Sequence, residues 1–129
     1  MSLTVGRHFK LEEFEDWRAT RPVPDIAFAG VVILCYVALD PLRKEFGLTR
    51  VSSGFRTRAT NDQVGGAEYS RHVYSDWPFA PAADVQPESG NPQQWADFLE
   101  TVMSGTGGLG IYSTHVHVDL RPSRARWRG

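Results

Sequence analysis

Residues 108–120 read Gly-Leu-Gly-Ile-Tyr-Ser-Thr-His-Val-His-Val-Asp-Leu, and this stretch predicts a β-hairpin. The two strands are expected over 110–112 and 116–120. Polar and apolar residues alternate through the second strand, in the order His115, Val116, His117, Val118, Asp119 and Leu120. Because successive side chains point to opposite faces of a strand, the three polar residues share one sheet face. Two imidazoles and a carboxylate gathered on one face indicate a functional site.

A second stretch, residues 70–85, supplies possible partners for that face. It reads Ser-Arg-His-Val-Tyr-Ser-Asp-Trp-Pro-Phe-Ala-Pro-Ala-Ala-Asp-Val. His72, Asp84 and His117 together make two imidazoles and one carboxylate, a set that suits a catalytic zinc with its fourth position open. Their spacing alone is weak evidence, because histidines and aspartates occur at such separations by chance. The alternation around His117 strengthens it, and one Zn²⁺ per chain is expected.

Composition excludes several classes of protein. At 129 residues, with 41% hydrophobic and 22% charged residues, the chain is expected to form a single globular domain over 1–129. A net charge of -1 argues against a protein that works by wrapping nucleic acid. One cysteine, Cys35, excludes an intramolecular disulfide and any multi-cysteine metal site, and its apolar surroundings predict a buried, inert thiol.

The most apolar part of the chain predicts a core helix. Residues 1–10 contain no apolar run of a secretory signal, and the longest apolar run, 27–39, falls short of the roughly 20 residues needed to span a bilayer. We expect a helix over 26–46 that is apolar nearly all round and central to the core. Pro41 is expected to kink or restart it, with Asp40 as the new cap.

The remaining pattern predicts an α+β fold, in which a small antiparallel sheet has flanking helices on one side. Further strands are expected over 48–52 and 82–85, a short helix or loop over 58–66, and a helix over 91–103 capped by its Asn-Pro start. The N-terminal segment is expected to pack through its aromatic and leucine side chains, which are Phe9, Leu11, Phe14 and Trp17. The tail 121–129 carries four arginines and is expected to be a solvated terminus that pins Trp127 on the domain; contact with nucleic acid is the alternative.

Several short motifs occur in one order along the chain. They are Ser-Gly-Phe-Arg (53–56), Asn61, Gly-Gly-Ala (65–67), Ser-x-His (70–72), Ala-x-Asp (82–84), Gly-x-Gly-x-Tyr (108–112) and His-Val-Asp (117–119). In this order they resemble the zinc D-alanyl-D-alanine carboxypeptidase family, peptidoglycan peptidases whose fold is shared with the hedgehog signalling domain. The segments 8–14 and 42–47 are also similar to that family, so the resemblance extends from residue 8 to residue 127.

The resemblance implies roles for individual residues. It makes His72, Asp84 and His117 the zinc ligands. Arg56 would hold a substrate carboxylate or carbonyl, for which a guanidinium is well suited; a surface salt bridge is the alternative. The remaining candidates are Ser70 and Tyr112 as substrate-binding residues, with Ser70 also a possible support for the metal ligands, His115 as general base or oxyanion stabiliser, and Asp119 as a residue that orients the ligands or pairs with Arg121.

The chain departs from the family pattern at two places. The segment between His72 and Asp84 is longer than in the family pattern, with the extra residues around 74–79. These residues include Asp76, a rival ligand, and aromatic side chains that could shape substrate access. Asp84 is favoured, because Ala-Ala-Asp-Val fits a strand. Where some members have an acidic general base, this chain has Thr114, so the neighbouring His115 is the nearest titratable replacement.

The function implied by the resemblance is zinc-dependent hydrolysis of peptidoglycan stem or cross-link peptides, by a D,D-carboxypeptidase or endopeptidase. We expect a phage-encoded lytic enzyme or a virion-associated one, located in the host cytoplasm before release or in the virion, with other virion proteins as possible partners. The alternative is a non-catalytic module that keeps zinc for stability. A nucleic-acid binder without metal is the weakest interpretation.

Overall fold

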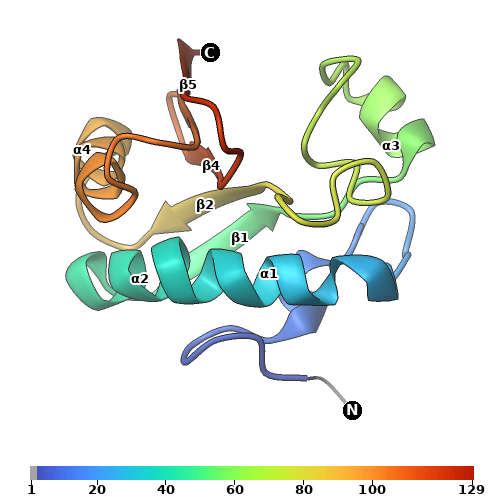
Figure 1. The fold of residues 1–129 in the computed structure, drawn as a ribbon, viewed down its shortest axis with the longest axis horizontal. Coiled ribbons are helices and arrows are strands. Elements are labelled where there is room, and N and C mark those ends of the chain that lie inside the picture. Colours follow the sequence, from blue (N-terminus) through green and yellow to red (C-terminus); the bar gives the residue numbers. More distant parts are fainter. Residues whose placement is uncertain (1–2) are drawn as a thin grey trace.

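A computed structural model describes residues 3–129, and its centre is a five-stranded sheet with the strand order β1-β2-β4-β3-β5 (Figure 1). The strands are β1 (Thr49–Ser53), β2 (Ala83–Pro87), β3 (Gly108–Ile111), β4 (Val116–Asp119) and β5 (Ala125–Arg128). The predicted α+β class and the predicted hairpin are confirmed. The sheet is not purely antiparallel, however, because β5 runs parallel to β3.

Residues 3–129 form four α-helices, of which two cover one face of this sheet. The helices are α1 (Phe28–Leu34), α2 (Asp40–Phe46), α3 (Arg58–Gln63) and α4 (Pro92–Val102), with short 3-10 helices at Leu11–Phe14 and Asp25–Ala27. Helix α2 contacts β1 and β2, α4 contacts β3 and β4, and the two helices contact each other. Val85, Val116 and Val118 are fully buried beneath them. The polar alternation in β4 therefore leaves its histidine face on the side of the sheet opposite α2 and α4.

The long helical stretch Asp25–Phe46 changes its winding before Pro41. A π-helical segment, Cys35–Leu39, joins α1 to α2. Proline lacks a backbone N–H and its ring crowds the carbonyl four residues earlier, which a locally wider turn relieves. The helix continues through Pro41 without a break, so the predicted restart does not occur, and the change of winding lies in the π-helical turn before the proline. Asp40 is not a helix cap, because the Asp40 carboxylate accepts a hydrogen bond from the backbone N–H of Arg7 at 2.8 Å.

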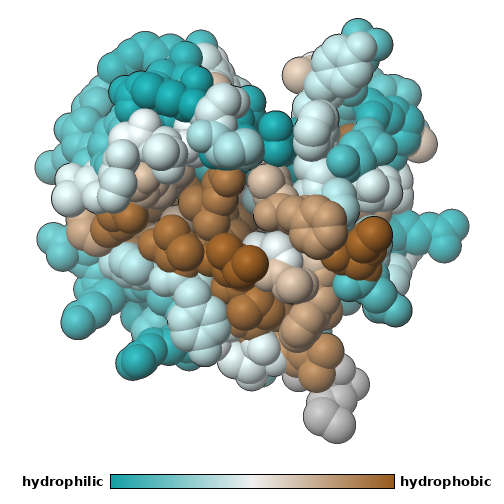
Figure 2. All heavy atoms as spheres, in the orientation of Figure 1, coloured by the Kyte–Doolittle hydropathy of each residue, from teal (hydrophilic) through white to brown (hydrophobic). Residues whose placement is uncertain are grey.

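The prediction that this helix is buried on every side is wrong. Several apolar side chains of the stretch are exposed, among them Ile26, Phe28, Ile33 and Val37. Figure 2 shows a hydrophobic band on the face where α1 and α2 lie in Figure 1. By length and composition alone the 22 residues of Asp25–Phe46 could cross a bilayer, but half of their most apolar window is buried inside the fold. That burial is expected of a core helix, so the stretch is only weak evidence for a membrane span.

The N-terminal segment braces the turn that follows β1. Phe9 and Phe14 are buried, as predicted, and their rings meet edge to face with centroids 6.1 Å apart. The carbonyl of Phe14 accepts a hydrogen bond from the backbone N–H of Phe55 at 2.8 Å. Trp17 does not pack as expected and is 61% exposed. The segment therefore fixes the backbone that carries the Ser-Gly-Phe-Arg motif.

The arginine-rich tail ends in the strand β5. Arg124 and Arg128 are exposed, as expected of a solvated terminus, whereas Arg126 is partly buried. Glu100 of α4 binds both Arg124 and Arg126, with Nη–Oε1 distances of 2.9 and 2.7 Å. These contacts hold β5 against β3 at the edge of the sheet. The prediction that the tail fixes Trp127 on the fold is confirmed, since β5 carries this residue.

Replacing Glu100 by glutamine is expected to destabilise the fold by about 1 kcal/mol at pH 7, a value discounted for solvent screening. Hydrogen bonds from Arg126 and Arg124 lower the pKa of Glu100 from 4.5 to about 2. A lowered folded-state pKa contributes stability above pH 4.5, and this contribution is lost as the pH falls through about 2. Urea unfolding of wild type and variant across this range measures the difference. The exposed Glu12→Gln is the matched control, and an equal loss there would contradict the role of Glu100.

Candidate metal centre

Strand pairing and one loop bring His72, Asp84 and His117 together. Asp84 in β2 lies directly opposite His117 in β4, so both side chains project from the same sheet face. His72 comes from the loop after α3, and its carbonyl accepts a hydrogen bond from the backbone N–H of Arg56 at 2.8 Å. One potential ligand atom from each of the three residues lies within 4.8 Å of the others, and all three residues are buried.

The separations of these atoms fit a metal ion. His72 Nε2 lies 3.1 Å and His117 Nδ1 lies 3.3 Å from the same Asp84 oxygen, Oδ1. Ligands placed about 2.0–2.1 Å from a tetrahedral zinc are roughly 3.3 Å from one another. The two separations from Asp84 therefore match those expected around zinc, and the third, between the two imidazoles, is at most 4.8 Å.

The far nitrogen of each imidazole is already bonded. His72 Nδ1 lies 2.7 Å from the Gly54 carbonyl oxygen, which can only accept, so this nitrogen carries the proton. His117 Nε2 lies 2.7 Å from Asp119 Oδ2 and donates to that carboxylate. Hydrogen bonds of this kind fix the tautomer and orientation of metal-binding histidines. Both imidazoles consequently turn a bare lone pair towards Asp84.

Three acceptor atoms that face one another require a positive charge between them. Burial by itself would raise the pKa of Asp84, but the neighbouring imidazoles His72 and His117 lower it overall, so its carboxylate is ionised. Burial lowers the pKa of His72. Burial also acts to lower the pKa of His117, but the carboxylates of Asp119 and Asp84 outweigh it and raise that pKa, so the position between His117 and Asp84 attracts a proton when no cation is bound. A metal cation or a proton satisfies this demand, and the donor set of two imidazoles and one carboxylate suits zinc.

Comparison with known proteins assigns the family. Residues 7–119 match the profile of a family described as Peptidase M15. The chain belongs to the peptidase M15 family. This family is that of the zinc D-Ala-D-Ala carboxypeptidase-like peptidases, so membership implies a metallopeptidase, and the predicted resemblance is confirmed. A search of curated proteins found no match.

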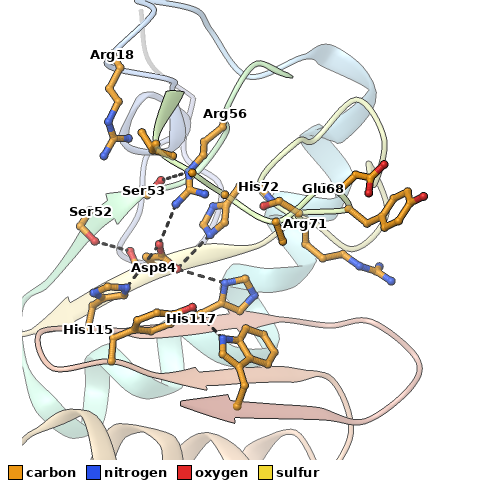
Figure 3. Close-up of a pocket in the computed structure, with 18 of the residues that line it drawn as sticks. Arg18, Ser52, Ser53, Arg56, Glu68, Arg71, His72, Asp84, His115 and His117 are labelled. Carbon is orange, nitrogen blue, oxygen red and sulfur yellow. Dashed lines mark hydrogen bonds and ion pairs between the residues drawn. The ribbon is translucent and has the colours of Figure 1, made fainter. Parts of the chain in front are cut away.

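The metal centre of this M15 chain opens into a cleft. A cavity of about 820 Å³ adjoins the three ligand residues. Its wall includes four arginines, which are Arg18, Arg56, Arg71 and Arg121. Figure 3 labels three of these, Arg18, Arg56 and Arg71, together with the His72–Asp84–His117 group. The cleft is therefore rich in positive charge and in hydrogen-bond donors.

Arg56 lies beside the metal centre and is more than a surface salt bridge. Its side chain is only 14% exposed, and its Nη2 lies 3.4 Å from Asp84 Oδ2. Nε donates to Ser53 Oγ, and Nη1 donates to Asn61 Oδ1. These three bonds leave two of the five guanidinium N–H groups for another acceptor in the cleft. Burial lowers the pKa of Arg56, though an arginine remains charged.

His115 and Tyr112 form one side of the cleft mouth. Their rings stack with centroids 4.5 Å apart and an angle of 9° between planes. His115 Nδ1 lies 3.0 Å from the Thr114 hydroxyl, and its Nε2 lies 3.8 Å from Asp84 Oδ2. The imidazole therefore has one nitrogen held by Thr114 and the other directed towards the metal centre.

The other predicted site residues lie in different positions. Ser70 lines the cleft, and its Oγ accepts a hydrogen bond from the backbone N–H of His72 at 3.2 Å. Asp119 is fully buried behind His117, where it also accepts two side-chain bonds from Arg121, so it supports a ligand and does not face the cavity. Asp76, the rival ligand, pairs with Arg58 at the surface and is not part of the cluster.

The aromatic side chains at 74–79, which were expected to shape substrate access, are not part of the cleft wall. Tyr74 is fully buried and its hydroxyl donates to the Ala82 carbonyl at 2.8 Å. Phe79 is 79% exposed, and neither Phe79 nor Trp77 lines the cavity. The segment therefore supports the wall from outside.

Trp127 belongs to the site, although its position in the basic tail did not predict a place there. Its ring centroid lies 4.8 Å from that of His117, and its Nε1 donates to the Tyr112 hydroxyl at 2.9 Å. Gly110 makes room for it, because a Cβ there would lie 2.4 Å from the indole ring. The only signal in the sequence is a glycine in a strand, which often marks a close approach of another group.

Proposed function

We propose that this protein is a zinc-dependent peptidase that cleaves peptidoglycan stem or cross-link peptides. The observation that carries this proposal is the buried group of His72, Asp84 and His117, whose free lone pairs converge beside an open cleft. Membership of the M15 family supports the same conclusion. A phage lytic or virion-associated setting is part of the proposal.

Zinc, when bound by His72, Asp84 and His117, supplies Lewis-acid polarisation of a carbonyl and lowers the pKa of water. Arg56 binds the substrate through its two remaining N–H groups, which suit a carbonyl or carboxylate oxygen. In the tautomer in which His115 Nδ1–H donates to the Thr114 hydroxyl, Nε2 accepts a proton and returns it to the leaving amine. Asp119 and the Gly54 carbonyl hold the two metal-binding imidazoles in orientation.

The alternative is a non-catalytic module that retains zinc for stability. The observation that supports it is Thr114, which occupies the position where some members of the family have an acidic general base. Under this alternative the same metal centre forms, but His115 is only a packing partner of Tyr112.

Removal and return of the metal tests the proposal directly. The purified protein is expected to contain about one zinc per chain and to release soluble peptides from purified peptidoglycan. Dialysis against a chelator is expected to abolish the release, and one equivalent of zinc is expected to restore it, because the ion would supply the Lewis acid that hydrolysis requires. One zinc without hydrolysis would favour the structural alternative. Hydrolysis that survives complete metal removal would refute both interpretations.

A further inference from the structure

Arg71 is a half-buried arginine for which the fold provides no acceptor. It precedes His72 and lines the cleft, but its side chain points away from the metal centre, as Figure 3 shows. Among residues 3–129 its guanidinium makes no ion pair, and its side chain donates no hydrogen bond. A guanidinium carries five N–H donors and a permanent charge. Arg71 therefore presents an unused anion-binding group to the cleft.

The segment 74–79 holds this guanidinium in place. Arg71 Cζ lies 3.9 Å from the ring centroid of Trp77, a cation–π contact that restricts the side chain. Asp76, the residue before Trp77, is paired with Arg58 of α3, which ties the segment to the neighbouring helix. The residues that lengthen the step between His72 and Asp84 thus build a support for Arg71.

The charges around Arg71 favour an anion. Arg121 lines the same cleft and adds a second positive charge beside Arg71. The nearby carboxylate of Asp119 is fully buried and already binds Arg121 and His117. Glu68 also lines the cleft but makes no ion pair with Arg71. Two arginines therefore share this part of the cleft, and the nearby buried carboxylate is already paired.

We propose that Arg71, held by Trp77, binds a second carboxylate of the substrate, away from the bond that is cleaved. The cleft then selects peptides with a free carboxylate over peptides in which that group is an amide. This inference rests on the proposed function, because it defines the substrate class of the same site. In a stem peptide the group is the α-carboxylate of the γ-linked glutamyl residue.

Two synthetic probes that differ in one group test this inference. They are L-alanyl-γ-D-glutamyl-L-lysyl-D-alanyl-D-alanine with the glutamyl α-carboxyl either free or amidated. Binding is measured by calorimetry on metal-free protein, so that cleavage does not consume the probe. Wild type is expected to bind the free acid about tenfold more tightly, the lower end for a charge-assisted hydrogen bond at a half-buried site.

Three variants locate the preference. Arg71→Gln is expected to bind both probes equally, whereas Arg50→Gln, which removes the same charge from an exposed position on β1, is expected to keep the tenfold preference. Trp77→Leu keeps the charge of Arg71 but removes the ring that holds its guanidinium, and is expected to reduce the preference for the free acid severalfold. If circular dichroism shows that Arg71→Gln does not fold, the Trp77→Leu result tests the inference in its place. A preference that survives in Arg71→Gln, or wild type that binds neither probe at millimolar concentration, overturns the inference.

Hydrolysis of the free acid, assayed separately with zinc present, distinguishes this inference from the proposed function. Preferential binding without hydrolysis refutes the peptidase proposal and leaves the carboxylate site intact. Hydrolysis without any preference refutes the carboxylate site and leaves the peptidase proposal intact.

Discussion

His117→Ala protein is expected to purify without zinc and to lose peptide hydrolysis by about 10³-fold or more. The substitution removes one of three ligands and leaves Asp119 buried without its imidazole partner. Metal catalysis contributes several kcal/mol to barrier lowering, and each 1.36 kcal/mol is a factor of ten in rate. Zinc content by elemental analysis and release of D-alanine from a stem pentapeptide measure the two effects.

His8→Ala is the matched control for this experiment. Besides His72, His115 and His117, the chain has one further histidine, His8, which is exposed and does not belong to the cluster. Its replacement is expected to leave zinc content and hydrolysis unchanged. If His117→Ala retains one zinc per chain, the ion is held by other residues and the proposed centre is wrong.

His115→Asn is expected to lower kcat by about 10²–10⁴-fold while zinc content stays at one per chain, the range for loss of a general acid–base group. Asparagine cannot exchange a proton at the position of Nε2, which faces Asp84 Oδ2 at 3.8 Å. Because His115 is not among the three ligand residues, the ion is retained. Steady-state kinetics on the same pentapeptide separates kcat from KM.

Thr114→Val provides a graded comparison for the His115 variant. It removes the hydroxyl that holds His115 Nδ1 but keeps the imidazole, so a smaller fall in kcat is expected. An unchanged kcat in His115→Asn would show that this imidazole moves no proton. The aromatic stacking with Tyr112 would then be its only contribution to the site.

Local pattern predicted the elements that depend on neighbours in sequence. The helix over 91–103 was expected from its Asn-Pro start and forms as α4, where the Asn91 side chain accepts from the Gln94 N–H at 2.9 Å. The alternation through β4 predicted which side chains share the cleft face. Motif order also predicted that His72, Asp84 and His117 meet, although their separations alone did not require it.

Contacts between distant residues decided the remaining features. The edge strand β5 pairs with β3, and Glu100 of α4, far earlier in the chain, binds Arg126 in this strand and Arg124 just before it. The helix at Asp25–Phe46 is apolar on all sides, yet which face is buried depends on where β1, β2 and α4 pack.

The sequence by itself determined the α+β class, the family and the residues able to hold a metal, because hydrophobic period and motif order are local properties of the chain. Only the tertiary structure placed Trp127 against His117 and Arg71 over Trp77. Stacking of this kind depends on a few ångströms of separation between side chains. Those separations are set by the packing of strands and loops, which no local pattern encodes.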